Sequence, residues 1–189
     1  MNDRRHLGAT GVVACWILLT LSGCSAQELE ARDFVSVLTV PDGDTESLLA
    51  ERQRTSTCTL DYSHTKAVIL DTTLTQNPEQ LDNVLETLLS RPEFAWNLLV
   101  FTGDEETLRR TDEKKEKLGL ELTAYYKNHT AEEESGELVP VTLLDLWNWR
   151  TGSGEELSLP VLSWQEDNLI PEGVLMIKSP CSSPKRDLQ

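Results

Sequence analysis

The clearest pattern of hydrophobic and polar positions lies between Lys66 and Gly103. Residues 67–70 form a short apolar run that ends at Asp71-Thr72-Thr73, and such a run is typical of a strand buried on both faces. A second apolar run covers residues 96–101 and ends at Thr102-Gly103. These two runs predict two strands whose carboxyl ends carry polar residues.

The segment between the two runs predicts a helix. Asn77 is a favourable N-cap, Pro78 suits the first helical position, and Pro92 ends the pattern. Apolar residues recur at the spacing of one helical face, at Leu81, Val84, Leu85, Leu88 and Leu89. A strand, a helix and a strand at this spacing predict a βαβ unit with two parallel neighbouring strands and a right-handed crossover.

Further elements follow along the chain. Acids at 104–106 and lysines at 114, 115 and 117 predict a helix whose end charges complement the helix dipole, with Gly119 as its C-cap. Residues 120–126 alternate apolar and polar positions and predict a third strand. Weaker patterns predict a first strand or stem at 34–40, helices at 46–54 and 139–149, and strands at 159–164 and 174–177.

This order of elements predicts an α/β fold with an open, mainly parallel sheet of about four or five strands flanked by helices. Four parts are expected along the chain: a leader at 1–26, a stem with the first elements at 27–65, the α/β domain at 66–178 and a flexible tail at 179–189.

The leader has the features of an export signal. Arg4 and Arg5 precede an apolar stretch at 12–21, which is about ten residues long and too short for a comfortable membrane span. Small residues in Cys24-Ser25-Ala26 suit a cut before Gln27, whereas Leu21-Ser22-Gly23-Cys24 resembles the lipobox of bacterial lipoproteins, in which the cysteine is lipidated. An uncleaved signal anchor is a third possibility. All three place the folded part outside the cytosol, in the secretory pathway or in a bacterial envelope.

The net charge of -15 limits the classes of partner. A nucleic-acid partner needs a basic face, and anionic lipid needs clustered cations, so membrane contact is expected only through the leader. Outside the leader, Cys58 and Cys181 could form one disulfide in an oxidising compartment or remain free thiols. Asn128 opens an Asn-His-Thr glycosylation sequon, which matters only in a eukaryotic host.

Candidate chemistry follows the predicted strands. In Gln165-Glu166-Asp167-Asn168, the carboxylates of Glu166 and Asp167 are hard oxygen ligands of the kind that bind Mg²⁺ or Mn²⁺. Asp71, Thr72, Thr102 and Gly103 are expected at the same carboxyl edge of the sheet, where α/β folds bind ligands, and are candidate contacts to a nucleotide. The alternatives are a polar corner for 165–168 and a helix-capping turn for 71–73.

Other active-site patterns are absent from the sequence. There is no Gly-x-Gly-x-x-Gly, no P-loop and no Gly-x-Ser-x-Gly, so an ordinary dinucleotide site, an NTP site and a hydrolase elbow are not supported. The three histidines are scattered, and no His/Cys cluster has zinc spacing.

The order of pieces resembles a poorly characterised glycosyltransferase-like family with a nucleotide-sugar-transferase (GT-A-type) architecture. The resemblance covers roughly residues 64–175 and rests on Ala67–Asp71, the helix after Pro78, Trp96–Gly103, Leu143–Trp149 and Leu159–Asn168. It implies that Asp167, beside Glu166, holds a metal and the diphosphate of a nucleotide-sugar, and that Asp71 faces the nucleotide.

Two departures weaken the implied activity. The family tends to place an arginine where this chain has Thr73, and the chain continues only briefly after Asp167, where such transferases carry the acceptor-binding half. The resemblance therefore implies a truncated or inactive member, and it supplies no catalytic base. The alternative function is a non-catalytic secreted or lipid-anchored binding protein of the envelope.

Overall fold

The computed structural model describes residues 32–114, 117–129, 138–152 and 156–178. Its strands are β1 (Arg32–Phe34), β2 (Val37–Val40), β3 (Thr59–Asp61), β4 (Ala67–Asp71), β5 (Leu99–Gly103), β6 (Glu156–Gln165) and β7 (Asn168–Lys178). Its helices are α3 (Thr45–Thr55), α4 (Pro78–Ser90), α5 (Glu105–Lys114), α6 (Leu118–His129) and α7 (Leu143–Thr151), with a 3₁₀ turn at Leu74–Gln76. None of the helices in these ranges is both long and apolar enough to cross a membrane.

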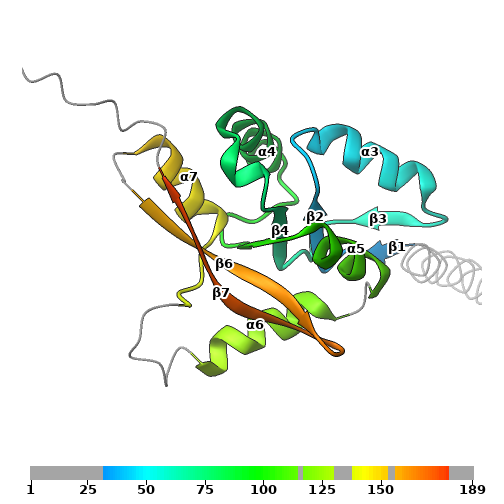
Figure 1. Cartoon of the computed structure of the whole chain (residues 1–189). Helices are drawn as coiled ribbons and strands as arrows, with labels where there is room; N and C mark the ends of the chain where they lie inside the picture. The colour runs from blue at the N-terminus through cyan, green and yellow to red at the C-terminus, as the bar shows by residue number, and fades with distance from the viewer. Residues whose placement is uncertain (1–31, 115–116, 130–137, 153–155, 179–189) are drawn as a thin grey trace, which may run out of the picture.

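The main sheet has five strands in the order β2-β4-β5-β6-β7 (Figure 1). β2, β4, β5 and β6 run parallel, and β7 returns antiparallel to β6. β1 and β3 form a separate parallel pair, and β1 directly precedes β2 along the chain. The predicted α/β class with an open, mainly parallel sheet is confirmed. Because β2 belongs to the main sheet, that sheet already begins at Val37.

The βαβ unit between Lys66 and Gly103 is also confirmed. β4 and β5 are parallel neighbours in a register that pairs Ala67 with Leu99 and Asp71 with Gly103. The side chain of Asn77 caps α4 by accepting a hydrogen bond from the amide of Gln80 at 3.3 Å, and Pro78 is the first helical residue. The second strand is shorter than the apolar run, because residues 95–98 form a turn before it.

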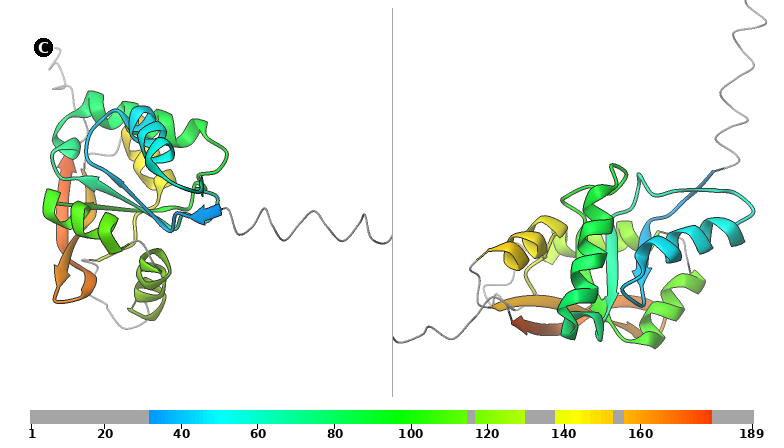
Figure 2. Two further views of the ribbon diagram at one scale, coloured as in Figure 1. Left: turned by 90° about the vertical axis from the view of Figure 1, so that its right-hand side faces the viewer. Right: turned by 90° about the horizontal axis from the view of Figure 1, so that it is seen from above.

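Helices cover both faces of the sheet (Figure 2, left). Along β4, Val68 and Leu70 pack into one hydrophobic core with α3, α4 and α7, whereas Ala67 and Ile69 pack into a second core with α5 and α6. This alternation is the period of two expected of a strand with buried faces on both sides. The strand prediction at 67–70 therefore holds for each of its residues.

The prediction of a third strand at 120–126 is wrong, because these residues belong to α6. Leu118, Leu122 and Tyr126 are buried at helical spacing, and Leu120, which supplied the apparent alternation, is exposed. The prediction that Gly119 caps α5 is wrong for a related reason. Gly119 lies inside the first turn of α6, whereas α5 ends at Lys114.

Candidate functional site

The four residues predicted to contact a nucleotide lie together at the carboxyl end of β4 and β5. The amide and the hydroxyl of Thr72 each donate a hydrogen bond to the carbonyl oxygen of Gly103 at 3.0 Å. The hydroxyl of Thr102, which is fully buried, donates to the hydroxyl of Thr72 at 3.3 Å. Asp71 accepts from the amide and the hydroxyl of Thr73 at 2.8 and 2.6 Å. Many of the hydrogen-bonding groups of these residues are thus already paired with one another within the turn.

The two predicted metal ligands form the tip of the β6–β7 hairpin. Gln165 pairs with Asn168, so Glu166 and Asp167 are the two connecting residues, and Glu166 has a positive φ of 52°. Such a left-handed conformation suits a tight hairpin turn. This geometry agrees with the alternative interpretation of residues 165–168 as a polar corner between two strands.

Helix α5 binds the hairpin tip through two cations. Lys114 forms an ion pair with Asp167 at 2.7 Å, and Arg110 donates to the carbonyl oxygen of Glu166 at 2.8 Å. Both cations lie over the indole of Trp164, at 4.8 and 4.9 Å from its centre. The hydrogen bond from Lys114 lowers the pKa of Asp167. The charge of Asp167 is therefore already neutralised by a neighbouring helix.

No polar contact joins the two halves of the predicted site among the described residues. Within residues 32–114 and 156–178, no hydrogen bond or ion pair joins the turn at β4 and β5 to the hairpin tip. In the part of the chain that the structure describes, no three His, Cys, Asp or Glu side chains are grouped to hold a metal. Binding of Mg²⁺ or Mn²⁺, and of a nucleotide by Asp71, Thr72, Thr102 and Gly103, stays an untested prediction with no contact to support it.

The remaining predicted residues fall in different places. Cys58 is a partly buried free thiol before β3, whereas Cys181 lies outside the described residues, so their disulfide stays a prediction. Cys24 also lies outside the described residues. Asn128 is exposed near the end of α6, and its glycosylation stays a prediction.

A cavity that the sequence did not reveal lies beside the edge strand β2. It has a volume of about 440 Å³, within the range of small-ligand sites, and its wall combines apolar and charged groups. The lining comes from β1, β2, α3, β3, α5 and α6, including Phe34, Val37, Arg52, Leu60, Arg109 and Asp112. Residues so far apart in sequence carry no common motif, so no pattern in the chain could have indicated this cavity.

Arg52 organises one side of this cavity by joining three elements. Its guanidinium, on α3, donates to the carbonyl oxygen of Thr39 on β2 at 3.1 Å and to Asp112 on α5 at 2.9 Å, and it also contacts the hydroxyl of Thr39. That hydroxyl donates to Asp112 at 2.6 Å. Because β2 is an edge strand, Arg52 occupies a backbone acceptor that would otherwise face outward. The result is a wall that combines apolar and charged groups.

Comparison with known families bears on the two functions considered from the sequence. The model of the spore germination protein N-terminal domain family matches residues 23–163, well over half of the chain. The chain belongs to this family. Comparison with curated proteins and with solved structures gave no significant match.

The resemblance to a glycosyltransferase family is therefore wrong. The pieces on which it rested are general to α/β folds: an apolar strand ending in an acid, a helix starting with proline, and a polar turn after a strand. The structure shows the same weakness, because the acids of the last piece form a hairpin tip that α5 binds. Family membership favours the alternative of a non-catalytic exported domain and agrees with the predicted export.

Proposed function

We propose that this chain is a lipid-anchored, non-catalytic domain with a receptor-like role in spore germination. The observation that carries the proposal is where the family match begins, at Gly23, directly before Cys24 in Leu21-Ser22-Gly23-Cys24. A cut before Gln27 would remove the first four matched residues. Lipidation of Cys24 would keep every matched residue except Gly23, so the match supports the lipobox interpretation of the leader.

An anchor at Cys24 would hold the folded domain close to a membrane. Arg32, the first residue of β1, follows Cys24 by eight positions. A fully extended chain spans at most about 3.6 Å per residue, so the start of β1 would lie within roughly 30 Å of the lipidated cysteine. The domain would therefore work as a membrane-surface component and not as a freely diffusing protein.

The cavity beside β2 is the place where we propose that the domain recognises its partner or ligand. Its apolar wall favours burial of a ligand, and the ion pairs of Arg52 with Asp112 and of Arg109 with Glu106 and Glu113 give the cavity a polar side that would orient the ligand. Recognition without catalysis agrees with the alternative function that the family match favours.

The test of the anchor replaces each leader cysteine in turn in the spore-forming host. Cys24→Ala is expected to move the protein from the membrane fraction to the soluble fraction, and to reduce germination when this chain is the only copy of its gene. Cys15→Ala is the matched control, because it removes a cysteine from the same leader outside the lipobox. It should leave both the location and the germination rate unchanged.

Two results would disprove parts of this proposal. If mass spectrometry finds a free N-terminal Gln27 in the unaltered protein, the lipid anchor is disproved. Normal germination of spores that lack the gene, in a strain with no second copy of the family, would disprove the germination role.

A further inference from the structure

Three large apolar side chains are exposed near the amino ends of β4 and β5. Phe34, Trp96 and Leu120 have exposed fractions of 42, 51 and 58%. Single exposed apolar residues are ordinary on a protein surface, but a group of them marks an interaction site. These three residues are called the amino-edge patch below.

The patch borders a hollow of about 450 Å³. Leu120 lines the hollow directly, and Ala95 and Asn97, the neighbours of Trp96, line it as well. Phe34 adjoins it through His64, whose ring meets the ring of Phe34 edge-on at 4.9 Å, while Ser63 and Thr65 line the hollow.

The backbone that presents the patch is fixed by hydrogen bonds. The carbonyl oxygen of Trp96 accepts from the amide of Leu144 at 3.0 Å, and that of Leu98 accepts from Leu143 at 2.8 Å. The carbonyl of Val141 accepts from the amide of Val100 at 2.7 Å, which ties the segment before α7 to β5. The exposed side chains are therefore displayed by an ordered frame.

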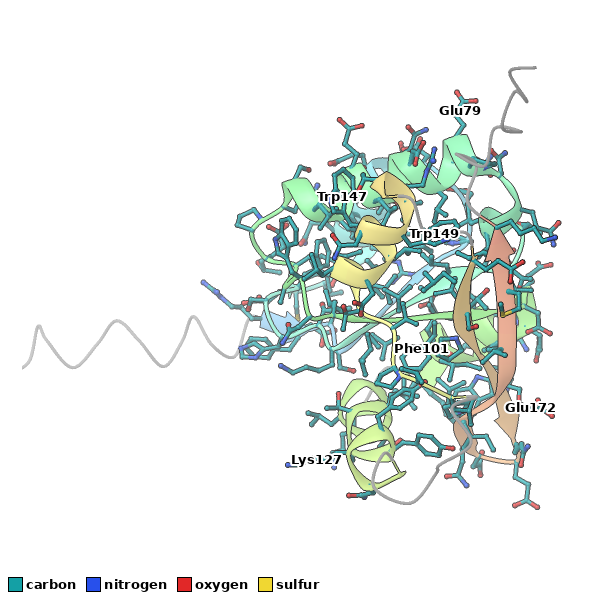
Figure 3. All side chains as sticks on the ribbon, turned by 90° about the vertical axis from the view of Figure 1, so that its left-hand side faces the viewer. Glu79, Phe101, Lys127, Trp147, Trp149 and Glu172 are labelled. Carbon is teal, nitrogen blue, oxygen red and sulfur yellow. The ribbon has the colours of Figure 1, made fainter. Side chains whose placement is uncertain are left out.

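The amino-edge patch lies on the side from which β1 begins. Views from opposite sides agree that β1 and the loop between α4 and β5, which contains Trp96, project the same way (Figures 2 and 3). Lys127 extends from α6 toward this side as well (Figure 3). Because Cys24 precedes β1 by only eight residues, an anchor at Cys24 would bring this side to the membrane.

We propose that the amino-edge patch docks on the phospholipid interface of the membrane that carries the lipid anchor. The inference rests on the proposed anchoring at Cys24. Tryptophan and phenylalanine are suited to the interfacial layer, and Lys66 and Lys127, which line the hollow, place cations at headgroup level. Since the chain has a net charge of -15, burial of apolar surface drives the contact, and attraction to anionic lipid does not.

Because the anchor already holds the protein at the membrane, a weak contact between the patch and the bilayer is enough for docking. Once Cys24 is held in the bilayer, docking of the patch becomes an intramolecular step at high effective concentration. Docking also fixes the orientation of the domain, because the patch and the tether lie on one side. The opposite side, where β4 and β5 end at Asp71 and Gly103, then faces away from the membrane.

The experiment tethers the full mature chain through Cys24 to a maleimide lipid, in a Cys58→Ser, Cys181→Ser background. Phosphatidylcholine vesicles with and without brominated acyl chains then report whether a tryptophan enters the bilayer. Brominated lipid should quench the emission of this protein and of its Trp147→Phe variant, because both keep Trp96. The quenching should be absent from Trp96→Phe and several-fold weaker in Leu120→Gln.

Three outcomes would overturn the inference. Equal quenching with and without Trp96, or no quenching of the tethered protein at all, would mean that the patch does not dock. Quenching that grows strongly when phosphatidylglycerol is added would mean that charge drives the contact. Because the maleimide supplies the anchor, these results stand apart from the cell-based test of lipidation, and either proposal can fail without the other.

Discussion

Gly119 shows how one residue is constrained by the close approach of two segments. It lies in the first turn of α6, against the chain that leads from β1 into β2. A Cβ atom at this position would lie 2.3 Å from the carbonyl oxygen of Ser36 and 3.0 Å from the Cβ of Lys66. That carbonyl oxygen accepts a hydrogen bond from the amide of Lys66 at 2.9 Å, so it has little freedom to move.

Gly119→Ala is expected to destabilise the protein by about 1–3 kcal/mol, the usual cost of overpacking. In an unconstrained helix the same change would stabilise by about 1 kcal/mol, so the sign of the effect tests the contact. Urea unfolding measures the difference. Gly173→Ala is the matched control, because a Cβ there meets no atom within 4 Å, and stability should change by less than about 0.5 kcal/mol. A more stable Gly119→Ala protein would contradict the structure.

At the scale of elements, the β6–β7 hairpin is held by α5 through a small charged and aromatic cluster. Trp164 donates from its indole nitrogen to the carbonyl oxygen of Thr107 at 3.3 Å, and Lys114 and Arg110 lie over its ring. Asp167 completes the cluster by pairing with Lys114. The hairpin, which also supplies the edge strand β7, is thus fixed to α5. This helix packs into the smaller of the two hydrophobic cores, the one that contains Ala67 and Ile69.

The cluster is expected to weaken in acid. The pKa of Asp167 is lower in the folded protein than in the unfolded chain, because Lys114 donates to the ionised carboxyl. The stabilisation is therefore present above the unfolded-state pKa of about 3.9 and is lost as the pH falls through the lower folded-state value. Asp167→Asn should lower the melting temperature slightly near neutral pH, and this difference should vanish once the pH falls below the folded-state pKa of Asp167.

Glu172→Gln is the control for this measurement. It removes a carboxylate from β7 in the same hairpin, and no ion pair joins Glu172 to another described residue. Its effect on the melting temperature should be smaller than that of Asp167→Asn near neutral pH. A difference between the unaltered protein and Asp167→Asn that grows on acidification would disprove the assigned pairing.

Elements with their own local signals could be predicted from the sequence, and α6 shows where this fails. Helix α4 has an N-cap at Asn77, Pro78 at its first position and one apolar face, and all these signals agree. In α6, the exposed Leu120 lies between the buried Leu118 and Leu122, so alternation and helical spacing fit the same short stretch. Only the packing of Leu118, Leu122 and Tyr126 against one core decides between them.

At the scale of the whole molecule, two hydrophobic cores share one sheet. β5 lies at the centre of the sheet and contributes Val100 to the larger core and Phe101 to the smaller one. The sequence predicted this sheet from its strands, but it could not predict the sites. The cavity beside β2 and the amino-edge patch each combine residues from several distant segments, and the predicted nucleotide and metal residues make separate sets of contacts.

Phe101→Ala tests whether the two cores unfold as one unit. Phe101 is fully buried and stacks on Tyr126, with ring centres 5.8 Å apart, so its truncation should cost about 3–5 kcal/mol. Because β5 belongs to both cores, far-UV circular dichroism and tryptophan fluorescence should report the same lowered urea midpoint. Phe34→Ala, the control, truncates an exposed ring and should change the midpoint little. Separate midpoints for the two probes would show that the core under α5 and α6 melts first, while the core that contains Trp149 remains folded.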